Sequence, residues 1–276
     1  ARLTADGQGL LAPRELAGQI YDLALLRELV SVGRNLVTSA LDTSERVEPL
    51  EQISEAEAAL YRVSEGASVG SEAQSFRTSS LAAITQIEKA LASGGHISGL
   101  TTGLDDLNAK VGGLHDSDLI ILAGRPAMGK TSLATNIAYN IAKAYKAEHN
   151  ADGSVKVTDG GVVAFFSLEM SAEQLATRII SEQAMIPSER IRRGKITEDE
   201  FAKIVEVTRE MQSLPLYIDA TGGITIAQVA ARARRLKRQR GLGLLVVDYL
   251  QLLSGSSRRA SEGRVQEVSE ITVGLK

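Results

Sequence analysis

Eight consecutive residues near the middle of this chain have the types and spacing of a phosphate-binding loop. The segment Gly124-Arg125-Pro126-Ala127-Met128-Gly129-Lys130-Thr131 fits the pattern Gly-x-x-x-x-Gly-Lys-Thr. In such a loop, backbone N–H groups converge on a phosphate, the lysine reaches the terminal phosphates and the threonine hydroxyl can bind Mg²⁺. An ordinary glycine–proline turn is the alternative. An apolar run before the loop and a helical pattern after it favour phosphate binding.

Two carboxylates follow apolar runs, at the place where an α/β sheet carries its active-site residues. Asp248 ends the run 244–247, and Glu169 follows the run 162–168. Asp248 is predicted to hold Mg²⁺, and Glu169 to orient or deprotonate the water that attacks the terminal phosphate. The alternatives are a plain strand-terminal aspartate and a glutamate that only favours the positive end of the next helix.

The predicted site residues fall into three groups. The catalytic residues are Glu169 and Lys130, and the metal ligands are Thr131 and Asp248. The cofactor-binding residues are Gly124, Arg125, Pro126, Ala127, Met128, Gly129, Lys130, Thr131 and Ser132.

These residues need a scaffold, and the sequence from about residue 100 alternates strand and helix patterns. Alternation of this kind predicts a parallel sheet with crossover helices. Apolar runs predict strands at 118–123, 161–167, 215–219 and 243–248. Helical periodicity predicts helices at 130–146, 171–185, 197–213 and 225–240. Capping boxes are expected at Ser171 with Gln174, Thr197 with Glu200, and Thr225 with Gln228. The polar segment 147–160 is predicted to be a surface insertion.

Before residue 100 the patterns are helical or linker-like. Residues 13–63 show helical spacing, and 64–77 are rich in Ser, Gly, Glu and Ala, as in a flexible linker. Residues 78–92 place Leu81, Ile84, Ile87 and Leu91 on one helical face. That face could pack on its own domain or dock on a neighbouring subunit. The predicted division is a helical domain end at 1–63, a linker at 64–99 and a nucleotide-binding domain at 100–276.

Composition excludes some classes of protein and leaves nucleic-acid binding to local patches. The 276 residues carry a net charge of −3, so bulk charge does not predict nucleic-acid binding. There are no cysteines, which excludes disulfides and cysteine zinc sites. No apolar run approaches the ~18 residues of a membrane span, and no signal peptide is visible; a cytoplasmic location is expected.

Basic residues form two clusters. The cluster at 232–240 is interpreted as the solvated end of a helix, whose cations suit the helix dipole. The cluster at 256–264 contains Arg258, Arg259 and Arg264. This second cluster could contact nucleic-acid phosphates or be an ordinary surface loop.

Taken together, the motifs resemble those of the bacterial replicative helicase family, DnaB. The resemblance rests on Gly124–Thr131, Phe165-Phe166-Ser167-Leu168-Glu169-Met170 and Val247-Asp248-Tyr249-Leu250-Gln251-Leu252, and Gly99–Leu107 is similar to the start of the family's motor domain. It implies a RecA-like ATPase core that acts as a homohexamer around single-stranded DNA. It also implies 5′→3′ travel driven by ATP and Mg²⁺, with unwinding at the replication fork.

The resemblance further assigns roles and partners. It implies that Glu169 is the catalytic glutamate, that Arg258, Arg259 and Arg264 lie in DNA-contacting loops, and that the helix at 78–92 docks on the adjacent subunit. Primase and a helicase loader are the expected protein partners. Because the family continues beyond the equivalent of Lys276, the motor domain is expected to be incomplete at its C-terminal end, and the N-terminal domain to lack its start.

Two other interpretations remain open. A recombinase-type or clock-type RecA-like ATPase would share the nucleotide site but form filaments or separate no strands. The linker helix and the residues around Glu169 and Asp248 argue against that class. A non-enzymatic scaffold assembled through residues 1–92 would carry a vestigial loop, and the intact Lys130 and Thr131 argue against it.

Overall fold

The computed structural model describes residues 13–42, 49, 52–53, 55–56, 59–60, 63, 75–92, 97, 99–149, 155–254 and 264–275. By its internal contacts the chain divides into two units, Ala1–Ser79 and Ser80–Lys276. None of the described helices is both long and apolar enough to cross a bilayer.

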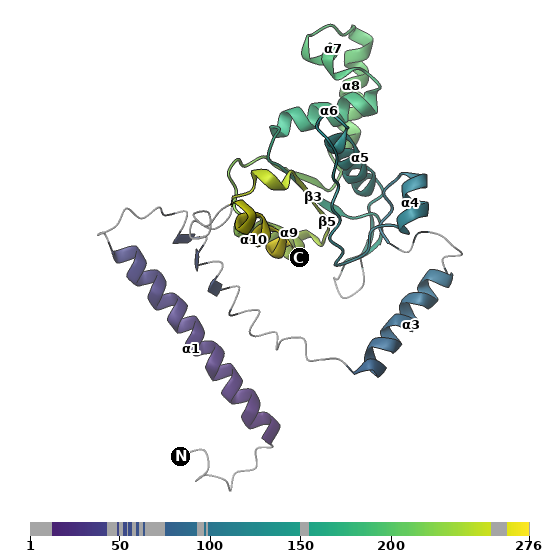
Figure 1. Ribbon diagram of the computed structural model, residues 1–276. Helices are drawn as coiled ribbons and strands as arrows, with labels where there is room; N and C mark the ends of the chain where they lie inside the picture. Colours follow the sequence, from purple (N-terminus) through teal and green to yellow (C-terminus); the bar gives the residue numbers. More distant parts are fainter. Residues whose placement is uncertain are drawn as a thin grey trace. The chain divides into compact units, whose positions relative to one another are not determined.

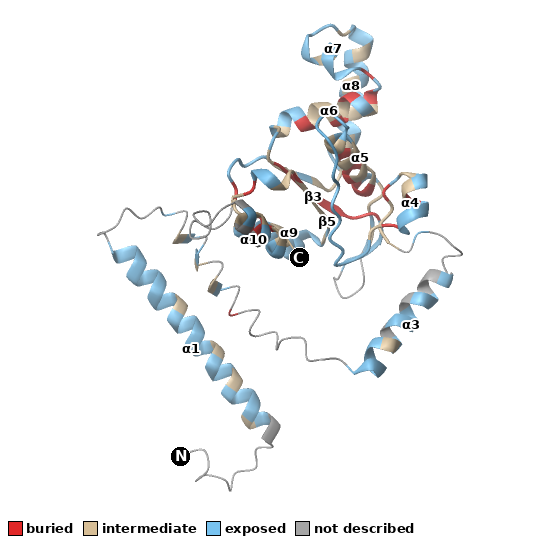
Figure 2. Cartoon of the chain, viewed as in Figure 1, coloured by how far each residue is buried: buried red, intermediate tan, exposed pale blue. Residues whose placement is uncertain are grey.

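The first unit contains the long helix α1, Pro13–Leu41, as its helical periodicity predicts. Further described positions between 49 and 63 are also helical. Apolar side chains of α1 lie exposed along the helix; Leu23, Leu26 and Val30 are each more than half exposed (Figure 2). Helix α1 therefore presents apolar surface that nothing within the described part of this unit covers.

Helix α3, Phe76–Ala92, spans the boundary between the two units. It contains the helix that the sequence predicts at 78–92. The four apolar residues expected on one face, Leu81, Ile84, Ile87 and Leu91, are all at least half exposed. As in α1, helical periodicity is present without a described partner for the apolar face.

The second unit is built on a three-stranded parallel sheet of order β4-β3-β5. Its strands are β3 (Val162–Ser167), β4 (Leu216–Asp219) and β5 (Leu242–Asp248). All six residues of β3 are buried. A central parallel strand is covered on both faces, which is why its sequence is a continuous apolar run. Three of the four predicted strands are thus confirmed.

Helices cover both faces of this sheet (Figure 1). Helices α5 (Lys130–Lys143) and α6 (Ala172–Ala184) form one core with Val163 and Phe165 of β3. Helices α9 (Ile226–Arg240) and α10 (Arg264–Leu275) form a second core with Ala164 and Phe166. Successive strand residues point to opposite faces, so β3 divides its side chains between the two cores.

The strand predicted at 118–123 is wrong. These residues pair with no strand among the residues that the structure describes, and Ile120 and Ile121 are 58% and 72% exposed. An apolar run shows only that a segment is suited to a sheet. Strand formation also requires a neighbour that supplies hydrogen bonds, and the described strands pair among themselves.

The segment predicted as a polar insertion is more ordered than the sequence analysis indicates. Strands β1 (Lys146–His149) and β2 (Val155–Asp159) pair as an antiparallel hairpin, and residues 150–154 lie outside the described residues. Exposed Val155 and Val157 alternate with polar residues in β2. This period of two is the signal that could have predicted a strand.

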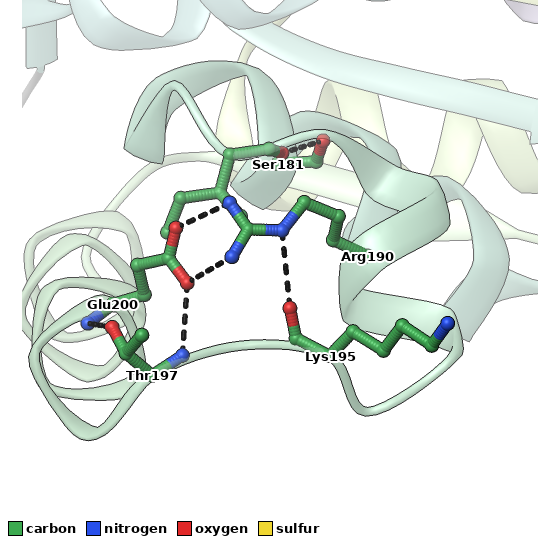
Figure 3. Close-up of polar contacts among 6 residues, drawn as sticks. Ser181, Arg190, Lys195, Thr197 and Glu200 are labelled. Atoms are coloured by element: carbon green, nitrogen blue, oxygen red, sulfur yellow. Dashed lines mark hydrogen bonds and ion pairs between the residues drawn. The ribbon is translucent and has the colours of Figure 1, made fainter.

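Three predicted capping boxes are present, at Ser171, Thr197 and Thr225. The box at Thr197 starts α8 (Glu198–Met211) and is reinforced from α7 (Ser188–Arg192). Arg190 donates to both carboxylate oxygens of Glu200, at 2.7 and 2.9 Å, and its Nε donates to the Lys195 carbonyl (Figure 3). This bidentate contact fixes the connection between α7 and α8.

A small buried polar cluster ties the segment around Thr102 to α5. Asn108, in α4 (Asp105–Val111), accepts hydrogen bonds from both the backbone N–H and the hydroxyl of Thr102. Asn140 of α5 donates to the Thr102 carbonyl at 3.0 Å. The turn that follows Thr102 requires a glycine at position 103, because Gly103 has a φ of +72° and packs against the Asn140 side chain.

Candidate nucleotide-binding site

The predicted phosphate loop has a backbone conformation suited to binding an anion. Ala127 and Gly129 have positive φ, of 63° and 83°, and the Met128 N–H donates to the Arg125 carbonyl at 3.3 Å. Helix α5 begins directly afterwards, at Lys130, and no side chain caps its N-terminus. Uncapped N–H groups at a helix start, together with a glycine turn, favour a bound phosphate.

Lys130 lies folded back over this loop. Its Nζ donates to the carbonyls of Gly124 and Arg125, at 2.9 and 3.1 Å. Both acceptors are neutral and solvent-exposed, so a phosphate oxygen would be a stronger partner for the ammonium group. Thr131 is half-buried and Ser132 is exposed. The loop thus keeps a cation over a surface that is open to solvent.

Asp248 ends β5 as a buried carboxylate with an unsatisfied oxygen. The residue is 8% exposed, and its Oδ2 has no hydrogen-bond partner in the described part of the chain. A buried carboxylate oxygen without a donor is costly unless a cation compensates it. Oxygen ligands such as this one are those that Mg²⁺ takes in proteins, so the residue fits the predicted metal.

Glu169 is exposed, in the turn between β3 and α6. The buried hydroxyl of Ser167 donates to the Met170 carbonyl at 2.7 Å, which holds this turn closed. Ser171 then caps α6. The alternative role, in which Glu169 only interacts with the positive end of α6, also fits this position. The carboxylate of Glu169 is accessible to solvent.

The sheet register brings the two carboxylates to one edge. Ser167 pairs with Asp248, and the Leu168 N–H donates to the Asp248 carbonyl at 2.8 Å. Glu169 lies two residues after Ser167, so both acidic residues lie at the carboxyl ends of neighbouring strands. Within the described residues, neither carboxylate is hydrogen-bonded to the loop at 124–131. The loop leads into helix α5, which packs on β3 and β5 and so connects the loop to the strands that carry the two acidic residues.

The structure does not test the three predicted DNA-contacting arginines. Arg258 and Arg259 lie outside the described residues. Arg264 is the first residue of α10, and its side chain also lies outside them.

The other basic cluster, on α9, is partly paired. Arg232 donates to Asp219 and to the Thr221 hydroxyl, and Lys237 donates to the Leu242 carbonyl just beyond the helix. Burial raises the pKa of Asp219, but the hydrogen bonds from Thr221 and Arg232 outweigh it and lower the pKa below its usual value. Arg232 and Lys237 thus both have partners outside the helix, and the interpretation of this cluster as a solvated helix end stays a prediction for the remaining cations.

Two supporting residues escaped the sequence analysis. Ser167 fixes the turn that carries Glu169, and Asn140 anchors α5 to Thr102. A serine that ends an apolar strand is a weak signal for such a turn. An asparagine in mid-helix gives no signal, because its partner lies 38 residues away in the sequence.

Comparisons with known proteins identify the family to which this chain is similar. The model of the DnaB-like helicase C-terminal domain matches residues 99–276. The chain is 41% identical over 279 residues to "Replicative DNA helicase DnaB" of Rickettsia conorii, covering 100% of this chain and 55% of the relative. It is 35% identical over 257 residues to "Replicative DNA helicase DnaC" of Bacillus subtilis, covering 93% of this chain and 53% of the relative. The chain thus spans about half the length of these curated relatives.

Solved structures show the same fold. A structure described as an ATPase domain matches with a TM-score of 0.62 and 24% identity, covering 74% of this chain and 66% of that one. A DnaB-like replicative helicase described with its primase interactions matches with a TM-score of 0.57 and 20% identity, covering 95% and 57%. The predicted α/β class, a RecA-like core preceded by a helical segment, is confirmed. With residues 99–276 matched by the family model and strong identity along its whole length, the chain belongs to the DnaB-like helicase family.

Proposed function

We propose that this chain is part of a replicative DNA helicase, which hydrolyses ATP to travel 5′→3′ along single-stranded DNA and to unwind duplex DNA at the replication fork. The observation that carries the proposal is the placement of Asp248 and Glu169 at one sheet edge by the β3–β5 register. The uncapped start of α5, behind an exposed glycine loop, supplies the phosphate site that such a motor requires.

In this proposal each predicted site residue has a chemical role. Residues 124–132 hold the ATP phosphates, and Lys130 exchanges its two carbonyl partners for phosphate oxygens. The Thr131 hydroxyl and Asp248 Oδ2 hold Mg²⁺, which neutralises phosphate charge when bound. Glu169 orients the attacking water and accepts its proton. The unpaired oxygen of Asp248 supports the metal assignment.

The proposal extends to organisation and partners. Residues 100–276 would form the motor domain, 64–99 the linker and 1–63 the end of a helical N-terminal domain. The assembly would be a cytoplasmic homohexamer around single-stranded DNA, with Arg258, Arg259 and Arg264 near the strand. Primase is a proposed partner because a structurally similar helicase is described with it. A helicase loader is a further proposed partner. No association with a membrane is proposed.

A recombinase-type ATPase without strand separation is the second candidate, because the same nucleotide chemistry would serve it. Unwinding of a forked duplex by the intact parent protein, with ATP and Mg²⁺, separates the two. Strand separation that requires a 5′ single-stranded tail supports the helicase. ATP turnover that never separates strands would favour the recombinase-type motor.

The role of Glu169 is tested by Glu169→Gln, with Glu182→Gln on exposed α6 surface as the matched control. Loss of the base is expected to lower ATP turnover by about 10²–10⁴-fold and to abolish unwinding, while nucleotide affinity persists. The control should behave as the parent protein. Turnover that is unchanged in Glu169→Gln would remove this residue from the mechanism.

A further inference from the structure

A pocket of about 350 Å³ lies between α9 and the β4 side of the sheet. Its inner wall is apolar, formed in part by Phe166, Ala164 and Leu236. Phe166 and Ala164 are buried, at 3% and 5% exposure. A space of this size accommodates one large apolar side chain or a small ligand. It faces α9, whereas the candidate nucleotide-binding loop leads into α5, which packs on the opposite face of the sheet.

The rim of the pocket is cationic. Arg232 is committed to Asp219 and Thr221, which also fixes one side of the pocket. Arg235 and Arg240 line the pocket as well, and neither guanidinium is paired with another residue in the described part of the chain. A guanidinium fork suits a carboxylate or a phosphate. An apolar wall beneath two free guanidinium groups therefore selects a ligand that is both apolar and anionic.

The pocket opens beside a free strand edge. Tyr217, Ile218 and Asp219 of β4 line it, and β4 pairs with β3 on one side only in the described chain. The Val163 N–H donates to the Pro215 carbonyl, so Leu216 and Ile218 direct their backbone groups away from β3. The Leu216 N–H donates to the Leu214 carbonyl at 2.8 Å, so the open part of this edge is the Leu216 carbonyl and the backbone groups of Ile218. An open strand edge is a template for another extended backbone.

We propose that β4 and α9 form a docking site for an extended acidic peptide segment of a partner protein. The segment adds as a strand along β4, places one large apolar side chain in the pocket and pairs its carboxylates with Arg235 and Arg240. Nucleic acid fits less well, because its sugar–phosphate backbone has no N–H groups and cannot pair with a strand edge.

Fluorescence anisotropy with a defined probe tests this proposal. The probe is a fluorescein-labelled seven-residue peptide of alternating glutamate and valine with a central phenylalanine. We expect saturable binding that weakens at least tenfold in Arg235→Glu/Arg240→Glu. The matched control, Arg192→Glu/Arg238→Glu, makes the same charge change at exposed sites outside the pocket and should stay within about threefold, as expected for exposed, screened charges.

Two changes to the probe separate the parts of the site. Replacing phenylalanine by glycine should weaken binding at least tenfold if the pocket holds that side chain. Methylating alternate backbone nitrogens should do the same if the peptide adds to β4. Equal affinity of the pocket variant and the control variant would overturn the proposal.

A labelled seven-residue oligothymidine distinguishes the alternative ligand. Oligothymidine that binds more tightly than the peptide, and loses that affinity in the pocket variant, would overturn the peptide assignment in favour of nucleic acid. ATP affinity should be unchanged in both arginine variants. Failure of the docking site would therefore be visible independently of the proposed ATPase.

Discussion

The carboxylate of Asp248 illustrates how a residue suited to binding a cation can oppose folding. Its Oδ2 is buried and unpaired in the described part of the chain, and an unsatisfied buried polar group costs about 1–3 kcal/mol. Such a residue is best explained by the cation that it receives when the site is occupied. Stability without nucleotide and affinity for Mg²⁺ should therefore respond in opposite directions to its replacement.

The substitution Asp248→Asn tests that opposition. Removing the buried charge should raise the free energy of unfolding by about 1–2 kcal/mol when nucleotide is absent. The rise in melting temperature on adding Mg²⁺ and ATP should be lost. Denaturant unfolding and thermal melts measure both quantities, with Asp116→Asn at an exposed position as the control. A variant that is less stable without nucleotide would contradict this account of Asp248.

At the scale of single residues, the sequence predicted the features that a short continuous stretch of residues defines. The loop at 124–131 and the strand-terminal acids are visible because each group is short and continuous. Ser167 and Asn140 were missed because their roles depend on hydrogen bonds to atoms placed by folding. A single residue that acts through such a hydrogen bond leaves no clear sequence pattern from which its role can be inferred.

At the scale of helices and strands, some elements are determined by their own sequence and others by the elements with which they pair. Helices α6, α8 and α9 begin where their capping boxes predict, since a cap is formed within four residues. The strand expected at 118–123 is wrong because pairing depends on a distant neighbour, and the hairpin of β1 and β2 was hidden by its polar composition. Local chemistry was thus sufficient for the starts of these three helices and insufficient for these strands, and it gave no indication of the short helices α4 and α7.

The attachment of α5 to the segment around Thr102 predicts a sharp difference between two glycines. Gly103 and Gly223 have similar positive φ, of 72° and 67°, but a Cβ at Gly103 would lie 2.3 Å from Asn140 Nδ2, whereas none lies within 4 Å at Gly223. Both alanine substitutions incur backbone strain of about 1–2 kcal/mol. Gly103→Ala should cost about 1–3 kcal/mol more, from overpacking.

Denaturant unfolding of Gly103→Ala and Gly223→Ala measures that difference. Because the strain is shared, the gap between the two variants reports the contact with Asn140. Gly103→Ala combined with Asn140→Gly should recover part of the loss, because the Asn140 Cβ would itself lie 2.6 Å from the new Cβ and would remain in Asn140→Ala. Equal destabilisation in the two single variants would mean that the segment around Thr102 is not held against α5.

Across the whole molecule, apolar surface is exposed on several elements at once. Helices α1 and α3 are largely exposed (Figure 2). Both helices and the run 119–122 carry exposed apolar side chains without a described partner. Exposed apolar patches mark sites of association, and unpaired extended segments are the most prone to it. The chain by itself should therefore self-associate as its concentration rises.

We expect Ile120→Lys/Ile121→Lys to reduce that association several-fold in light scattering at fixed concentration. Both side chains are exposed, so the free energy of unfolding should change little, within about 0.5 kcal/mol per site. Phe201→Lys/Val205→Lys adds the same charge at other exposed apolar positions and controls for simple repulsion. An equal reduction by the control would show that net charge, rather than the unpaired run, governs association.

The pairing of Ser167 with Asp248 also constrains how this chain can vary in length over evolution. Inserting or deleting one residue within β5 would turn Asp248 to the opposite face of the sheet. The same change in the connections between strands would leave the register intact. Gaps that separate relatives of this chain should therefore accumulate in the connections between strands and be absent from 163–167 and 244–248, where the pairing is regular.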